Sequence, residues 1–115
     1  SPTLLSGARA EMNVCAKEVF APVAVLSSYV DFEDALAQVN DSEYGLQAGV
    51  FTRDFGRIWQ AFETLEVGGV LVNEAPTWRV EHMPYGGVKA SGTGREGPRY
   101  AIEDYTELRL LAIHL

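Results

Sequence analysis

Met83-Pro84-Tyr85-Gly86-Gly87-Val88-Lys89-Ala90-Ser91-Gly92-Thr93-Gly94-Arg95-Glu96-Gly97 divides the chain into two parts with different patterns. Five glycines and one proline in these fifteen residues disfavour a helix or a central strand. Glycine loses the most conformational freedom on ordering, and proline lacks an N–H donor. We therefore predict a loop at residues 83–97, with alternating strands and helices before it and one helix and one strand after it.

The apolar pattern upstream of this loop predicts three strands and two helices. The strands are expected at 23–30, 46–52 and 70–72, and the first reads as buried on both faces. Asp31 and Asp54 are suitable N-caps for helices at 32–39 and 55–65. In the second helix an apolar stripe is predicted at helical spacing, made of Phe55, Ile58, Trp59, Phe62 and Leu65. The alternation with short connections indicates an α/β fold, a parallel βαβαβ unit.

The remaining segments are shorter. Residues 3–5 and 12–16 are apolar runs separated by a polar loop. After the glycine-rich loop, Pro98 suits the first position of a helix that is expected to run to about Tyr105. Residues 108–115 are apolar on both faces and predict a terminal strand, which needs a partner because unpaired strand edges associate.

Composition excludes several classes of protein. The chain has 115 residues, enough for one domain, and 47% of them are hydrophobic, which supports a core rather than disorder. The net charge of −7 argues against nucleic acid or an anionic membrane as a partner. No apolar run is long enough to span a membrane. A single cysteine excludes an internal disulfide and favours a reducing compartment, the cytoplasm. Because no initiator Met precedes the first apolar run, we expect the chain to be part of a longer protein.

The chain contains partial matches to general catalytic and binding motifs, but the neighbouring residues do not fit those motifs. Gly92, Gly94 and Gly97 have the spacing of a dinucleotide fingerprint, but the residues before them read as loop rather than strand. Gly86-Gly87-Val88-Lys89 lacks the Gly-Lys-Ser/Thr order of a phosphate loop. Cys15 has no nearby histidine, so we interpret it as inert buried packing. His82 and His114 are isolated, and we expect no metal site.

Two charged residues stand out from their surroundings. Glu18 lies among apolar residues just before a predicted buried strand, so its carboxylate is either paired in the core or exposed in a cleft. Arg79 follows the end of the strand at 70–72, where α/β sheets bind ligands. A solvated loop arginine is the alternative interpretation for Arg79, and the sequence leaves both open.

Together these segments resemble the NAD(P)-dependent aldehyde dehydrogenase superfamily over nearly the whole chain. The segments that carry the resemblance, in matching order and spacing, are Lys17-Glu18-Val19-Phe20-Ala21-Pro22-Val23, Tyr44-Gly45-Leu46-Gln47-Ala48-Gly49-Val50-Phe51-Thr52, Gly68-Gly69-Val70-Leu71-Val72-Asn73, the loop from Pro84 to Gly97, and Tyr105-Thr106-Glu107. The resemblance implies the later half of the three-layer catalytic domain at residues 1–105. It also implies an oligomerisation strand at 106–115, and hence a homo-oligomer.

The resemblance also implies which site residues the chain supplies. Glu18 matches the acid that holds the nicotinamide ribose of NAD or NADP, and Phe20 matches the aromatic residue beside the nicotinamide. Ala21, where many members have Gly, and Lys17, where an acid is common, depart from the family pattern. No catalytic residue is expected here, because the family's nucleophilic cysteine, general-base glutamate and oxyanion asparagine match positions before Ser1. The isolated chain is therefore expected to be inactive.

For the substrate, the resemblance implies a cleft beside Asn73 and an aromatic tunnel residue at Tyr85. The segment from Asn73 to Arg79 and the segment from His82 to Tyr85 are similar to members that act on small oxygenated or anionic aldehydes. In such members the cysteine attacks the aldehyde, a hydride passes to NAD(P), and the thioester is hydrolysed to the carboxylic acid. The guanidinium fork of Arg79 suits an anionic group on the substrate. The alternative is a non-catalytic scaffold or interaction domain of the same fold.

Overall fold

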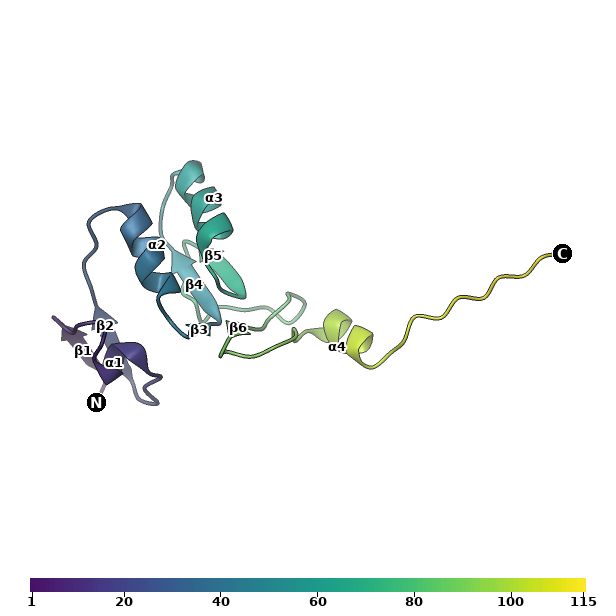
Figure 1. The fold of residues 1–115 in the computed structure, drawn as a ribbon, viewed down its shortest axis with the longest axis horizontal. Coiled ribbons are helices and arrows are strands. Elements are labelled where there is room, and N and C mark those ends of the chain that lie inside the picture. The colour runs from purple at the N-terminus through teal and green to yellow at the C-terminus, as the bar shows by residue number, and fades with distance from the viewer.

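The computed structural model describes residues 1–115 and contains four helices and six strands. In chain order these elements are β1 (Thr3–Ser6), α1 (Asn13–Ala16), β2 (Val23–Leu26), α2 (Phe32–Asn40), β3 (Tyr44–Gly45), β4 (Gln47–Val50), α3 (Phe55–Thr64), β5 (Gly69–Val72), β6 (Val88–Lys89) and α4 (Pro98–Asp104). The fold is mixed α/β, as predicted. Figure 1 shows the β1–β2 pair and α1 at one end and the tail that follows α4 at the other, with the remaining elements between them.

The strands form three two-stranded ladders rather than one sheet. β4 and β5 are parallel and are joined through α3, with Ala48 opposite Val70, which confirms this strand–helix–strand unit. β2, however, pairs in parallel with β1 and not with β4, so only the β4–α3–β5 part of the predicted βαβαβ unit shares one ladder. Apolar patterns identify strand segments, but which strand edges meet depends on the three-dimensional path of the chain, and that path brings β2 beside β1.

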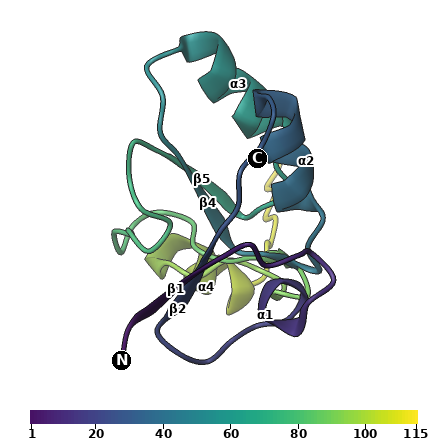
Figure 2. The ribbon, with the colours of Figure 1, turned by 90° about the vertical axis from the view of Figure 1, so that its left-hand side faces the viewer.

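The core lies between two helices and one face of the β4–β5 ladder (Figure 2). Leu36 from α2, Ala61 from α3 and Leu65, the residue just after α3, are buried there. Partly buried residues pack against this cluster. Ala48, Val50 and Val70 come from the strands, whereas Phe32 begins α2 and Val67 follows α3. Ala48 and Val50 point to the same face because side chains two residues apart on a strand share a face. Both helices therefore cover one side of this ladder.

The apolar stripe predicted on α3 is divided between the core and solvent. Of the predicted residues, Leu65 is buried and Ile58 is half-buried, whereas Phe55, Trp59 and Phe62 are 73%, 52% and 62% exposed. These three rings contact one another in sequence, with centroids 6.5 Å and 5.7 Å apart. The stripe is wider than the strip of helix surface that β4, β5 and α2 can cover, so its aromatic side stays outside.

Three further sequence predictions differ from the structure. β2 alternates half-buried and exposed residues instead of being buried on both faces, because no element covers its second face. The glycine-rich loop contains the short strand β6, which pairs antiparallel with β3. Residues 106–115 form no strand and leave α4 as an extended tail (Figure 1), since a strand needs hydrogen-bonding partners and none lies beside this segment. None of the helices has the length and apolar character required to cross a bilayer.

Both long helices begin at the predicted caps. The Asp31 carboxylate accepts a hydrogen bond from Asp34 N at 2.9 Å, and α2 starts at Phe32. Asp54 Oδ1 accepts from Gly56 N at 2.8 Å and Arg57 N at 3.3 Å, which satisfies two of the free N–H groups at the start of α3. These caps fix where each helix turns away from the strand or loop that precedes it.

Asn73 joins the ends of the two strands of the β4–β5 ladder. Its backbone has φ = 56°, a left-handed conformation that asparagine tolerates better than most residues. Its side-chain Oδ1 accepts from Thr52 N at 2.9 Å, and its Nδ2 donates to Thr52 O at 3.0 Å. The amide of Asn73 is thus occupied by the backbone just beyond β4.

We expect Asp54→Ala to lower the free energy of unfolding by about 1 kcal/mol, because two N–H groups at the start of α3 lose their acceptor. The matched control is Glu63→Ala, an exposed position in the same helix, which should change stability by less than about 0.5 kcal/mol. Urea denaturation followed by circular dichroism measures both. Equal effects would mean that the cap contributes nothing.

We expect Asn73→Gly to lower stability by about 1 kcal/mol, since two hydrogen bonds to Thr52 are lost. Asn73→Ala should cost about 1 kcal/mol more than Asn73→Gly, because alanine also pays for the left-handed backbone. Thermal unfolding of the two variants makes the comparison. An Asn73→Ala variant as stable as Asn73→Gly would show that the backbone leaves φ = 56° freely.

Candidate functional site

The polar segment that follows β5 folds back over the ladder face opposite the helices. Gln47 Nε2, on β4, donates to Pro76 O at 2.6 Å and contacts Trp78 O at 3.4 Å. A side chain at Gly49 would collide with the carbonyl oxygen of Glu74, so glycine there lets the segment lie close to β4. The sequence pattern alone indicated no role for Gln47. A glutamine on an apolar strand was the available signal.

Arg79 and Tyr85 come together at the end of this segment. The guanidinium carbon of Arg79 lies 4.3 Å from the centroid of the Tyr85 ring, a cation–π arrangement. Arg79 is two-thirds buried, and its Nε is buried without a hydrogen-bond partner. Its two terminal nitrogens point elsewhere: Nη1 lies 3.3 Å from a Glu96 carboxylate oxygen, and Nη2 lies 3.6 Å from one of Glu81. Arg79 is therefore not a freely solvated loop arginine.

Backbone hydrogen bonds join the two ends of the glycine-rich loop beside Arg79 and Tyr85. Tyr85 N donates to Glu96 O at 3.2 Å, and Glu96 N donates to Tyr85 O at 2.5 Å. Arg95 braces the loop from inside, with Nη1 donating to Gly87 O at 3.0 Å and to Gly94 O at 2.7 Å. The paired ends of the loop thus bring both Tyr85 and Glu96 into contact with Arg79.

Glu18 and Phe20 lie in the connection between α1 and β2. Both are exposed, Phe20 by 94%, so neither is paired in the core. An exposed carboxylate can accept hydrogen bonds from two neighbouring hydroxyl groups, and an open aromatic face can pack on a planar ring. A hydrogen-bond acceptor and a packing surface of these kinds fit the ribose hydroxyls and the nicotinamide ring of a dinucleotide.

Glu18 lies near Tyr44 in β3. The negative charge of Glu43 raises the pKa of the Tyr44 hydroxyl, and the charge of Glu18 contributes a smaller effect in the same direction. The connection that carries Glu18 is therefore near β3, which pairs with β6 in the glycine-rich loop. Asn73 is not part of either group, because Thr52 occupies its amide.

The structure corrects one interpretation and adds one observation. Cys15 is exposed rather than buried, because α1 is a single turn that no other element covers. It lines a hollow of about 380 Å³ with Lys17, Val19 and Val25 among its other walls. No group of three or more His, Cys, Asp or Glu side chains is arranged to bind a metal ion.

Comparisons with known proteins agree with this architecture. A family model described as "Aldehyde dehydrogenase family" matches residues 1–111. A 3-sulfolactaldehyde dehydrogenase from Priestia aryabhattai is 49% identical over 114 residues, which cover 99% of this chain and 24% of the relative. The chain thus spans about a quarter of the length of this relative.

Two solved structures share the fold over most of the chain. Aldehyde dehydrogenase 21 from Physcomitrella patens, in complex with the reaction product succinate, has a TM-score of 0.87 and 46% identity, covering 90% of this chain and 21% of that one. Glyceraldehyde-3-phosphate dehydrogenase GapN from Methanocaldococcus jannaschii, complexed with NADP, has a TM-score of 0.83 and 40% identity, covering 90% of this chain and 22% of that one. The chain belongs to the aldehyde dehydrogenase family.

Proposed function

We propose that the chain is the C-terminal part of an NAD(P)-dependent aldehyde dehydrogenase that oxidises a small hydroxylated or anionic aldehyde to its carboxylic acid. The observation that carries the proposal is the Arg79 guanidinium, held over Tyr85 with a buried and unpartnered Nε. Support comes from the Priestia relative, whose named substrate carries both a hydroxyl and a sulfonate group.

The two carboxylates beside Arg79 do not prevent it from binding an anionic group of the substrate. Glu81 and Glu96 are 87% and 68% exposed, and ion pairs in such solvated positions contribute little free energy. A sulfonate or carboxylate on the substrate can displace either one at small cost. It would then accept hydrogen bonds from the same planar fork, including the Nε–H that has no partner.

In this proposal the chain holds cofactor and substrate, while the nucleophile, general base and oxyanion asparagine are supplied by other residues of the protein. Glu18 would accept hydrogen bonds from the ribose hydroxyls, and Phe20 would pack beside the nicotinamide. NAD(P), when bound, supplies the hydride acceptor for aldehyde oxidation. Tyr85 forms one wall of the aldehyde path, and Asn73 shapes the adjoining strand end through its bonds to Thr52.

We expect Arg79→Ala in the complete enzyme to raise KM for 3-sulfolactaldehyde about ten- to hundredfold, since a charged hydrogen bond of this kind contributes roughly 1.5–3 kcal/mol. Lactaldehyde, which lacks only the sulfonate, should show a nearly unchanged KM. Arg79→Lys keeps the charge but loses the fork, and should fall between wild type and Arg79→Ala. Steady-state NAD(P)H formation measures all three. Equal changes for both aldehydes would assign Arg79 to structure alone.

We also propose that residues 108–115 pair with another subunit. Leu108, Leu110, Leu111, Ile113 and Leu115 are each at least 71% exposed in the single chain. Burying them at roughly 25 cal/mol per Å² would release several kcal/mol, enough to support association after ordering costs.

We therefore expect the 115-residue chain to associate in a concentration-dependent way, and deletion of 108–115 to shift it towards monomer. Glu63→Ala, at an exposed polar position of α3, is the control that should leave association unchanged. Sedimentation equilibrium measures the masses. A concentration-independent monomer for the intact chain would contradict the proposal.

A further inference from the structure

Lys89 has an unusual position within the glycine-rich loop. It is the last residue of β6, and its backbone has φ = 55°, a left-handed conformation that is unfavourable for lysine. Its side chain is only 23% exposed, although lysine is normally solvated. A residue keeps a strained backbone and a covered charge where the surrounding contacts hold it there.

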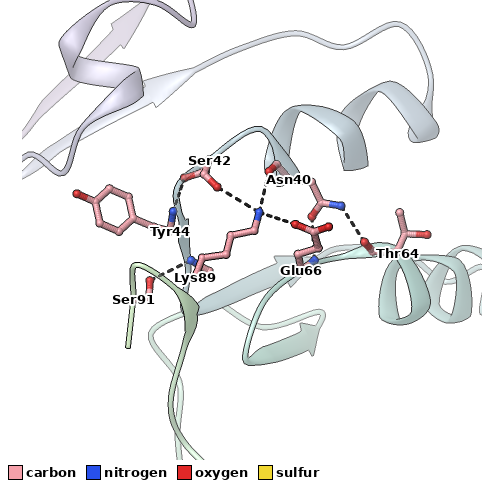
Figure 3. A network of polar contacts seen from close by, with 8 residues as sticks. Asn40, Ser42, Tyr44, Thr64, Glu66, Lys89 and Ser91 are labelled. Carbon is pink, nitrogen blue, oxygen red and sulfur yellow. Dashed lines mark hydrogen bonds and ion pairs between the residues drawn. The ribbon is translucent and has the colours of Figure 1, made fainter. Parts of the chain in front are cut away.

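The Lys89 ammonium has a full set of acceptors (Figure 3). Nζ donates to Asn40 O at 2.8 Å and to Ser42 O at 3.1 Å, and it lies 2.7 Å from a Glu66 carboxylate oxygen. An ammonium has three donors, so all three are used. The two carbonyls lie at and just beyond the C-terminus of α2, where a positive charge is favourable.

The groups that accept from Lys89 are themselves fixed. Asn40 Nδ2 donates to Thr64 O at 2.8 Å, and Asn40 Oδ1 accepts from Glu66 N at 2.8 Å, which joins the ends of α2 and α3. Lys89 therefore attaches the glycine-rich loop to a rigid junction of two helix ends. We call Lys89, Asn40, Ser42, Thr64 and Glu66 the Lys89 network.

The loop is anchored at two places. The Lys89 network holds its tip, and contacts among Tyr85, Glu96 and Arg79 hold its base. At the tip, Ala90 N donates to Glu43 O at 2.9 Å, beside the β3–β6 pair. At the base, the backbone bonds between Tyr85 and Glu96 close the loop, and Arg79 contacts both side chains. Only three residues separate Lys89 from Tyr85, so a shift of β6 must be passed on to the aromatic ring.

We propose that Lys89 is a positioning residue for the aldehyde site. Its ammonium fixes the tip of the glycine-rich loop against the two helix ends, and this sets the place of Tyr85 and Glu96 around Arg79. Lys89 touches neither substrate nor cofactor in this scheme. The part of the proposal that concerns the aldehyde rests on the function proposed above.

The test compares Lys89→Met and Lys89→Arg in the complete enzyme. Methionine keeps the length of the side chain but leaves the three acceptors without a donor, whereas arginine keeps the positive charge. For Lys89→Met we expect hydrogen exchange in peptides covering 84–97 to speed up about tenfold or more. We expect KM for 3-sulfolactaldehyde to rise about tenfold or more with kcat within about twofold, since displaced contacts weaken binding. Lys89→Arg should restore most of both.

A second pair of variants keeps the test decisive if Lys89→Met does not fold. Glu66→Gln removes only the charged acceptor and should loosen the same peptides to a smaller extent. Glu63→Gln, an exposed glutamate of α3 outside the network, should have no effect. Exchange in 84–97 that is unchanged in both Lys89→Met and Glu66→Gln would overturn the proposal. So would faster exchange with an unchanged KM, or an equal loss in kcat and in apparent affinity that arginine does not rescue.

The two proposals fail in different ways. If the wild-type enzyme oxidises neither 3-sulfolactaldehyde nor lactaldehyde, the proposed substrate class is wrong. Hydrogen exchange, which needs no substrate, then still decides whether Lys89 holds the loop. If the enzyme is active and only the exchange result is negative, the function stands and the role of Lys89 does not.

Discussion

The close approach of the glycine-rich loop to Gly68 is the constraint on which the rest of the structure depends. The carbonyl oxygen of Gly86 lies where a side chain on Gly68 would have to be, so the two backbones meet directly. Gly45 has the same relation to the carbonyl oxygen of Glu66. Because these contacts remove a layer of side chains, the loop comes near enough for β6 to pair with β3 and for Lys89 to reach the ends of α2 and α3. Tyr85 and Arg79 meet only because the loop is seated this way.

The chain buries little of its apolar surface. Six of 115 residues are buried, whereas the aromatic side of α3, Phe20 and the tail at 108–115 are open to solvent. Extended apolar surfaces of this size mark contacts with other protein. The polar contacts within the chain are, in contrast, nearly complete, and Arg79 Nε is the one buried side-chain polar atom without a partner. The surface is thus suited to being covered, and the unsatisfied donor lies at the candidate site.

Arg79 shows how charge is balanced where the chain would bind an anion. The cation is held between a ring face and two carboxylates, so it is oriented in the absence of a ligand. Orientation before binding reduces the entropy that a ligand would otherwise have to pay for. The carboxylates come from two different segments, one before and one within the glycine-rich loop. The loop therefore supplies the ring that orients the Arg79 guanidinium and one of the two carboxylates that balance its charge.

The sequence by itself determined the local elements of this protein. Asp31 and Asp54 marked the helix starts, and Pro98 marked the start of α4, because caps act over a few residues. Motif order over nearly the whole chain also identified the family and placed Arg79 and Tyr85 in one region. Only the tertiary structure decided that β2 pairs with β1, that the aromatic half of the α3 stripe is exposed, and that Asn73 is occupied by Thr52. The Lys89 network was equally invisible, since its members are 49 residues apart at the extremes and meet through backbone carbonyls, which carry no sequence signal.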